Sequence, residues 1–184
     1  MDKDFYFNVS QNDYWCQLLP NYEFDEENGI IRDKLSAERC LVVYKSGLES
    51  VFKGLSEIFK AGIEVLLLES SRAAGRNMVD SAAKGAKTDA KQMLSAYAKR
   101  FAQVGFGRLE VSELNLEEAR MTIRVWNNIF AEMRDKESTY CSYIAGLLSG
   151  IYEGLFRVFP KVKEVKCIGH GDPYCEFLLT LKAP

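Results

Sequence analysis

Two cysteines near the end of the chain, Cys167 and Cys175, flank a turn that contains glycine, histidine, aspartate and proline. The segment reads KEVKCIGHGDPYCEF over residues 163–177, and an apolar, strand-like run follows it directly. Two thiolates on such a hairpin can bind zinc if further donors converge on them, because structural zinc takes four nitrogen, sulfur or oxygen ligands in a tetrahedron. The alternative is a hairpin with two buried structural thiols.

Further candidate ligands lie in the hairpin or at the start of a predicted helix. Cys141 begins an apolar helical pattern, where backbone amides favour a thiolate. Glu164 and Cys167 are three residues apart, so in an unbroken strand their side chains would point to opposite faces of the sheet. If both bind the metal, the strand must bend or end between them. Otherwise His170 or Asp172 would be the fourth ligand.

Catalytic chemistry has less support than metal binding. His170 is the only histidine and stands between two glycines, so a Ser-His-Asp triad is not expected. A zinc ion with four protein ligands keeps no open position for water, so a filled site of this kind indicates a structural metal. The GFG at residues 105–107 lacks the strand-turn-helix setting of a dinucleotide-binding loop. We therefore predict no catalytic residues and favour a function other than catalysis.

The elements that position these residues follow from the spacing of apolar side chains. Residues 40–44, CLVVY, predict a short buried strand. Helical spacing predicts three helices in succession: residues 46–59, a second from about 62 through the stretch IEVLLLESSRAAGRNMVDSAA, and a third from about 88 to the GFG. The inward positions of the first are Leu48, Val51, Phe52, Leu55, Ile58 and Phe59. In the second, the small residues Ser71, Ala73, Ala74 and Gly75 allow close contact with a neighbouring element.

The second half of the chain changes to the two-residue period of strands. RLEVSEL and EARMTIRVW predict two strands joined by a turn around Asn115, with Ile123 facing the core and Trp126 on the other face, as a packing residue or a ligand contact. A fourth helix begins near Tyr140 and ends at Pro160. Its glycines at 146, 150 and 154 form a shallow groove, either for close approach to the sheet or for the apolar body of a ligand.

The predicted fold class is α+β, an antiparallel sheet covered by a layer of about four helices and closed by a C-terminal metal-binding hairpin. Residues 1–36 are interpreted as an N-terminal extension or dimerisation segment, with a turn at Asn28-Gly29 and a short strand at Ile30-Ile31. Residues 37–184 are interpreted as the ligand-binding domain.

Composition excludes several classes of function. The chain has 184 residues, 24 basic and 26 acidic, and a net charge of −2, so a nucleic-acid partner is not expected. No apolar run is long enough to span a bilayer, and the acidic, aromatic N-terminus lacks the core of a signal peptide, which predicts a cytoplasmic protein. Five cysteines, an odd number, argue against a disulfide framework in that compartment.

The C-terminal motif resembles the signature of the 4-vinyl reductase domain family. Glu164, Cys167, Gly171, Cys175 and Phe177 follow the order E-x-x-C-x-x-x-G-x-x-x-C-x-F. The SSRAAGR stretch and the glycine-bearing helix before the last hairpin fit the same pattern, so the resemblance extends from about residue 38 to residue 181. Only the C-terminal motif is specific.

The resemblance implies a ligand set for the metal. In family members that serve as sensory domains of phenol- and xylene-responsive bacterial activators, zinc is held by a cysteine at the start of the last helix, the glutamate and both hairpin cysteines. These roles fall on Cys141, Glu164, Cys167 and Cys175 in this sequence. The resemblance thus predicts one structural zinc ion per chain.

The resemblance also implies a binding module for a small apolar or aromatic molecule, acting as a sensor or carrier. The histidine and tryptophan that hold a phenol hydroxyl in the sensors have no recognisable counterpart here, which argues against a phenol ligand. The candidate pocket residues are Leu66, Tyr97, Phe101, Ile123, Val125, Tyr143 and Leu147. Each of them could instead be a plain core residue.

Two other functions remain open. One is a tetrapyrrole-related enzyme or carrier, after the vinyl reductases that name the family. The other is a scaffolding subunit, because the fold resembles small subunits of vesicle-tethering complexes. We also expect a homodimer, as in the sensory domains, and a downstream protein partner if the chain acts as a sensor.

Overall fold

A computed structural model of the chain describes residues 21–25, 27–34, 37–83, 89–133 and 140–181. The chain forms two units, with the boundary between Val43 and Tyr44. Residues 1–20, which include Cys16 and the aromatic N-terminal segment, lie outside the described residues. The expected pairing role of residues 1–36 therefore stays a prediction.

The first unit is a small antiparallel sheet in the order β1-β2-β3, with β1 at Tyr22–Asp25, β2 at Ile30–Asp33 and β3 at Arg39–Cys40. The turn between β1 and β2 contains Gly29 at φ 62°, and Asn28 donates two hydrogen bonds to the Asp25 carboxylate. Both the predicted turn and the predicted strand at Ile30-Ile31 are confirmed. A side-chain bond from the Asx residue and a glycine in the left-handed region are what such a turn requires.

The prediction of a buried strand over residues 40–44 is wrong. Strand β3 pairs with β2 only through Arg39 and Cys40, and the apolar residues Leu41 to Tyr44 are between 52% and 83% exposed. β-branched residues favour an extended backbone, but burial also needs a covering surface within the same unit. Here the run forms the connection between the two units instead.

The second unit contains a four-stranded antiparallel sheet in the order β4-β5-β7-β6. Its strands are β4 (Arg108–Asn115), β5 (Arg120–Trp126), β6 (Pro160–Lys166) and β7 (Cys175–Leu181). The two predicted hairpins, β4-β5 and β6-β7, are confirmed. Pairing of β5 with β7 joins them and places Val125 opposite Cys175, so the open end of one hairpin lies beside the cysteine-bearing turn of the other.

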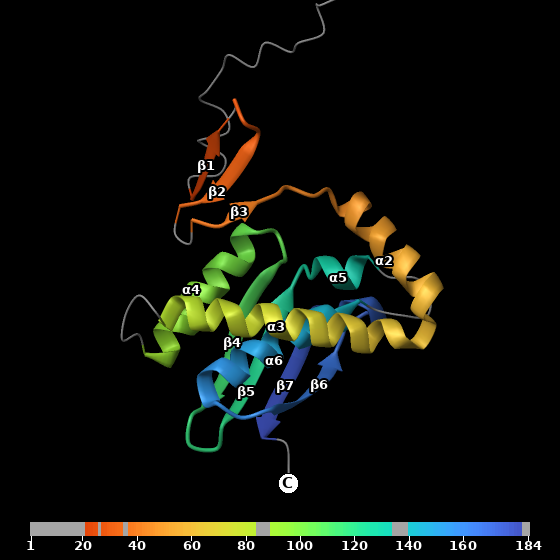
Figure 1. The fold of residues 1–184 in the computed structure, drawn as a ribbon. Helices are drawn as coiled ribbons and strands as arrows, with labels where there is room; N and C mark the ends of the chain where they lie inside the picture. Colours follow the sequence, from red (N-terminus) through yellow and green to blue (C-terminus); the bar gives the residue numbers. More distant parts are fainter. Residues whose placement is uncertain (1–20, 26, 35–36, 84–88, 134–139, 182–184) are drawn as a thin grey trace, which may run out of the picture. The chain divides into compact units, whose positions relative to one another are not determined.

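The helices of the second unit are α2 (Lys45–Phe59), α3 (Ile63–Ala83), α4 (Ala90–Gln103), α5 (Ile129–Glu132) and α6 (Cys141–Phe156), with 3-10 turns η1 (Lys60–Gly62) and η2 (Ile168–His170) (Figure 1). The four long helices correspond to the four predicted ones, which confirms the α+β class. The short helix α5 was not predicted, because four residues carry no periodic signal.

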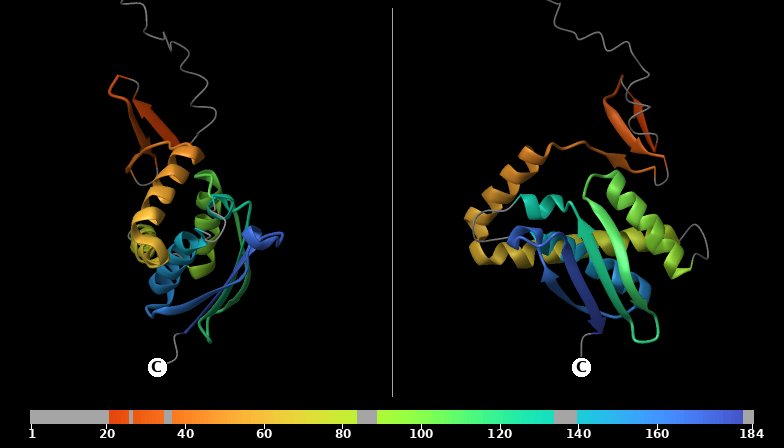
Figure 2. Two further views of the ribbon diagram at one scale, coloured as in Figure 1. Left: turned by 90° about the vertical axis from the view of Figure 1, so that its right-hand side faces the viewer. Right: turned by 180° about the vertical axis from the view of Figure 1, so that it is seen from behind.

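One face of the four-stranded sheet is covered by helices (Figure 2). Alternate residues of β5 and β7 are buried, among them Met121, Ile123 and Phe177. Helix α6 packs on this face and is itself covered by α3, and ten of its sixteen residues are buried. A helix that is apolar around its whole circumference needs this kind of central position.

The three glycines of α6 pack against α3 rather than against the sheet, so the predicted partner of the glycine stripe was wrong. A Cβ at Gly146 would lie 2.2 Å from the Leu68 carbonyl oxygen, and one at Gly150 would lie 2.1 Å from the Arg72 carbonyl oxygen. In α3, a Cβ at Gly75 would lie 2.2 Å from the Leu147 carbonyl oxygen. Since α3 fills the groove, the glycines do not form a binding surface for a ligand.

On the first two helices, several residues that were predicted to pack against other elements are exposed instead. On α2, Phe52 is buried and Leu48 and Leu55 pack against the core, whereas Val51, Ile58 and Phe59 are exposed. On α3, Ser71 is buried but Ala73 and Ala74 are exposed.

No described helix is both long and apolar enough to cross a membrane. The homodimer expected from the sequence stays a prediction.

Candidate metal centre

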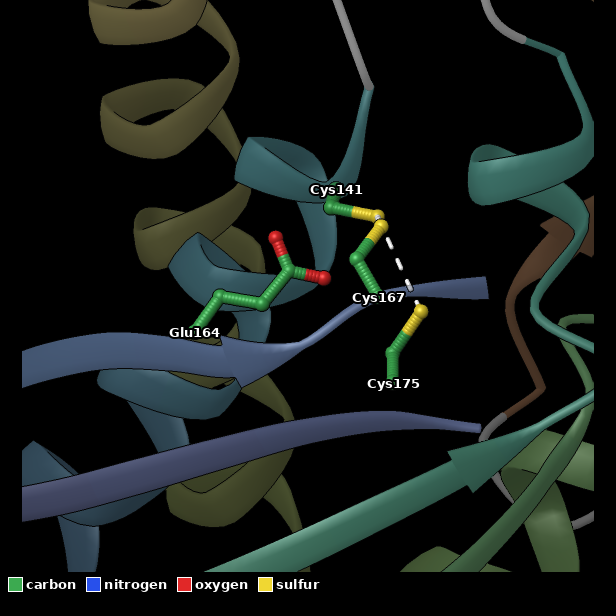
Figure 3. A group of neighbouring side chains, drawn as sticks. All are labelled: Cys141, Glu164, Cys167 and Cys175. Atoms are coloured by element: carbon green, nitrogen blue, oxygen red, sulfur yellow. Dashed lines mark hydrogen bonds between the residues drawn. The ribbon is translucent and has the colours of Figure 1, made fainter. Parts of the chain in front are cut away.

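Four side chains that are far apart in the sequence converge at one end of the sheet (Figure 3). Cys141 is the first residue of α6, Glu164 lies in β6, Cys167 follows β6, and Cys175 is the first residue of β7. Their ligand atoms all lie within 4.8 Å of one another, and the three cysteines are buried. The structure therefore brings together the four residues that the sequence predicted as one ligand set.

The distances between the sulfur atoms fit a shared metal ion. Cys141 Sγ lies 3.7 Å from Cys167 Sγ and 3.9 Å from Cys175 Sγ. In a tetrahedral site with zinc–sulfur bonds of about 2.3 Å, neighbouring sulfurs are about 3.8 Å apart. A disulfide would need about 2.05 Å, and these cysteines are free thiols. The two distances are therefore compatible with ligands around one ion.

A bulge in β6 lets Glu164 and Cys167 reach the same site. Glu164 pairs with Phe177 and Lys166 pairs with Glu176, so Val165 is an extra residue in the ladder. One inserted residue reverses the alternation of side chains beyond it. The strand ends at Lys166, directly before Cys167. This confirms the prediction that the strand must bend or end between the two ligands.

The turn between Cys167 and Cys175 is held by its own hydrogen bonds. The Cys167 carbonyl accepts the amides of His170 at 2.9 Å and Asp172 at 3.2 Å, and Gly171 has φ 97°. The Asp172 carboxylate accepts the Cys167 amide at 2.9 Å, and the His170 side chain is exposed. The cluster of candidate ligands contains Glu164 and neither His170 nor Asp172.

Asn128 also contacts the cluster, and sequence reasoning did not identify it. Its side chain is fully buried, and its amide nitrogen donates to Cys175 Sγ at 3.3 Å and to Cys141 Sγ at 3.6 Å. The contact depends on the pairing of β5 with β7, which a single sequence does not show. The only local signal is a polar Asn-Asn pair between a strand and the apolar run IFAEM.

The electrostatics of the cluster favour a bound cation. The hydrogen bond to Cys175 and burial raise the pKa of Cys141, burial raises the pKa of Cys167 to about 12, and the bond from Cys141 lowers the pKa of Cys175. Burial also raises the pKa of Glu164, whose Oε1 is buried without a hydrogen-bond partner among the described residues. A metal ion would supply the missing partner and the positive charge that thiolates need.

Seven rings form what we call the aromatic cluster, which extends from α2 across α5 and α6 to α4. Phe130 of α5 stacks on Tyr143 of α6 with ring centroids 4.5 Å apart, and Phe106 makes edge contacts with both. Its members are Phe52, Tyr97, Phe101, Phe106, Phe130, Tyr140 and Tyr143. Three of the predicted pocket residues are among them, Tyr97, Phe101 and Tyr143. Phe106 and Phe130 were not predicted as pocket residues.

The other predicted pocket residues lie in the core or at the surface. Ile123 and Val125 are on the covered face of β5 and Leu147 is buried in α6, while Leu66 of α3 is 39% exposed. A lining role for these four stays a prediction. Trp126 lies on the opposite face of the sheet from Ile123, where its ring packs on Tyr174 and its indole N–H donates to Glu110 at 3.2 Å. This is a packing role on the outer face.

Comparison with known proteins supports the resemblance on which the ligand set was predicted. Residues 121–181, which contain Glu164, Cys167 and Cys175, match the 4-vinyl reductase domain. The chain is 29% identical over 122 residues to the uncharacterized protein MJ0150 of Methanocaldococcus jannaschii, a segment covering 66% of each chain. The chain thus spans about two thirds of the length of this relative.

Solved structures share the fold at low sequence identity. The phenol-responsive sensory domain of the transcription activator PoxR, solved with phenol, has a TM-score of 0.74 at 15% identity, covering 95% of this chain and 92% of that one. A vinyl-4-reductase family protein from Methanocaldococcus jannaschii has a TM-score of 0.55 at 22% identity, covering 78% of this chain and 85% of that one. The sensory domain matches nearly the whole chain.

Proposed function

We propose that this chain, with its 4-vinyl reductase domain match over residues 121–181, is a small-molecule-binding sensor domain that is stabilised by a structural zinc ion and binds an apolar or aromatic ligand. The observation that carries the proposal is the aromatic cluster directly beside the metal centre: Cys141 and Tyr143 lie in the same turn of α6. The fold shared with a sensory domain supports the same function.

Zinc is the metal that suits these donors best. Three thiolates select a soft or borderline ion, and the sulfur spacing of 3.7 to 3.9 Å agrees with a tetrahedral site. With Glu164 as the fourth ligand, no position is left for water or substrate. The ion would therefore tie α6, β6 and β7 together rather than take part in a reaction.

The aromatic cluster offers both ring surfaces and hydrogen-bond donors. Burial raises the pKa of Tyr97 and of Tyr143, and the proximity of Tyr143 adds to the shift at Tyr97. Both hydroxyls therefore stay protonated across the physiological range, so each can donate one hydrogen bond. The surrounding phenylalanines favour a ligand with an aromatic or aliphatic body.

We expect the purified protein to contain about one zinc ion per chain, as measured by native mass spectrometry and elemental analysis. Glu164→Gln should weaken zinc retention, because it keeps the size of the side chain and removes the charge that balances the ion. The matched control is Cys40→Ser, since Cys40 belongs to β3 of the other unit. Zinc-free protein from metal-replete cultures, or full zinc retention in Glu164→Gln, would contradict this ligand set.

We expect ethylbenzene to raise the melting temperature, and ATP and NADPH to leave it unchanged. A ligand that binds only the folded state at about 100 times its Kd adds about 2.7 kcal/mol, or roughly 5 to 10 °C for a chain of this size. Phe106→Leu should reduce the shift, because Phe106 contacts Phe101, Phe130 and Tyr143.

The control for this experiment is Phe159→Leu, which makes the same substitution at an exposed ring outside the aromatic cluster. It should retain the full ethylbenzene shift. Stabilisation by NADPH alone, or equal loss of the shift in both variants, would refute the aromatic cluster as the binding site.

A further inference from the structure

Asn128 stands between the metal centre and the aromatic cluster and contacts both through one side chain. Its amide nitrogen donates to Cys175 Sγ at 3.3 Å and to Cys141 Sγ at 3.6 Å. Its amide oxygen accepts the backbone N–H of Phe130 at 3.1 Å, which makes Asn128 the N-cap of α5. The side chain is fully buried.

The cap fixes which end of the amide faces the sulfur atoms. Only an oxygen can accept the Phe130 N–H, so the nitrogen with its two hydrogens must point to the two cysteines. The two N–H groups of the Asn128 amide face the sulfurs of Cys141 and Cys175, and its oxygen faces the Phe130 N–H. Such bonds strengthen when the acceptor is a charged thiolate, as it is when a metal is bound.

The backbone around Asn128 is held by the segment that precedes β4. Asn127 has φ 51°, and Gly107 has φ 125°. A Cβ at Gly107 would lie 2.5 Å from the Trp126 carbonyl oxygen, and the Ile129 amide donates to the Phe106 carbonyl at 3.4 Å. Only glycine allows this close approach of two backbone segments. The position of Asn128 is therefore set by backbone contacts as well as by the cysteines.

On its other side, Asn128 caps the short helix that carries Phe130. Helix α5 has four residues, too few to be stable without its cap and its packing. Phe130 stacks on Tyr143 at 4.5 Å and meets Phe106 at 5.2 Å. A shift of the cap would move this ring within the aromatic cluster.

We propose that Asn128 is a positioning residue that couples the metal centre to the aromatic cluster: its amide orients the two sulfur ligands and, through α5, the Phe130 ring. This inference rests on the proposed function, because it needs a metal at the cluster and ligand binding at the rings. The coupling is reciprocal, so whatever fixes Phe130 also tightens metal binding, and metal binding orders α5.

Two substitutions separate the sulfur contacts from the cap. Asn128→Asp and Asn128→Ser both keep a side-chain oxygen that can cap α5, because Asn, Asp and Ser are about equally favourable at the N-cap. Aspartate replaces the donor by an anion facing the thiolates, and serine is too short to reach them. We expect both to weaken zinc binding roughly 10- to 100-fold, as removal of a partner of a metal ligand does. Chelator competition on the full chain measures the affinity.

A second readout tests the sulfur contact itself. With Co²⁺ in place of zinc, both variants should shift the sulfur-to-metal charge-transfer band, because a hydrogen bond to a thiolate changes its donor strength. A third readout is hydrogen exchange. In the wild type, zinc should slow exchange of the α5 amides relative to those of α4, and Asn128→Ser should lose most of this relative protection.

The outcomes are distinct. Wild-type zinc affinity together with an unshifted Co²⁺ band in both variants would overturn the role of Asn128 and leave the metal centre in place. Weakened zinc binding with unchanged relative protection of α5 would overturn the coupling. Should the wild type bind neither ion, the metal centre fails, and this inference with it.

Discussion

Replacing Cys175 by serine is expected to remove most of the zinc and to lower the free energy of unfolding by roughly 4 kcal/mol or more. For a chain of this size that corresponds to a fall in melting temperature of about 10 °C or more. Cys175 begins β7 and faces Cys141, so its loss leaves α6 and the two strands of the hairpin without their common link. Thermal unfolding with parallel zinc analysis measures both effects.

The direction of this effect follows from where the ligands lie. A metal held by adjacent residues would stabilise one turn, whereas this cluster joins residues 141, 164, 167 and 175, from a helix, two strands and the turn between the strands. Chelation should reproduce the loss in the wild type and add little in Cys175→Ser. Cys40→Ser serves as the thiol control and should match the wild type. If Cys175→Ser and Cys167→Ser both keep the metal content and melting temperature of the wild type, the hairpin is only a turn with two thiols.

The candidate ligand cluster could be predicted because three of its residues lie within one hairpin. Glu164, Cys167 and Cys175 span twelve positions, and their type and spacing carry the signal. The choice of Glu164 over His170 and Asp172, and the assignment of Cys141, came from the family resemblance. Even the irregularity of β6 could be deduced, because three-residue spacing is incompatible with a regular strand.

Asn128 could not be predicted, because its role depends on the order of the strands. Both hairpins can be predicted locally, but nothing in either one shows that β5 pairs with β7. That pairing sets Val125 against Cys175 and brings Asn128 to the sulfur atoms. Long-range pairing of this kind is decided by the packing of the whole unit rather than by local spacing.

The glycines show a different failure. Ser71 and Gly75 of α3 and the glycines of α6 were interpreted correctly as sites of close approach, but not as partners of each other, and Ala73 and Ala74 are exposed. Small residues in a helix indicate that another backbone packs closely against them, but they do not show which element it belongs to. The apolar run at residues 41–44 was predicted to be a buried strand, but its residues are exposed, and the run connects the two units.

Gly150→Ala is expected to lower the free energy of unfolding by about 3 kcal/mol, the upper part of the range for overpacking. The new Cβ would lie 2.1 Å from the Arg72 carbonyl oxygen and 2.7 Å from the Arg76 amide nitrogen. Both are backbone atoms of α3 and cannot move aside without shifting that helix. Alanine gains up to about 1 kcal/mol of helix propensity over glycine, so the net loss measures the contact between α3 and α6.

Gly54→Ala is the matched control, because Gly54 lies in α2 and a methyl group added at its Cα would have nothing within 4 Å. There the propensity term acts alone, and the same substitution should stabilise the protein by about 0.5 to 1 kcal/mol. The two variants should therefore shift the melting temperature in opposite directions. If Gly150→Ala is as stable as Gly54→Ala, α3 and α6 do not meet at the glycines, and α6 would lack the firm backing that holds Cys141 and Tyr143 at the site.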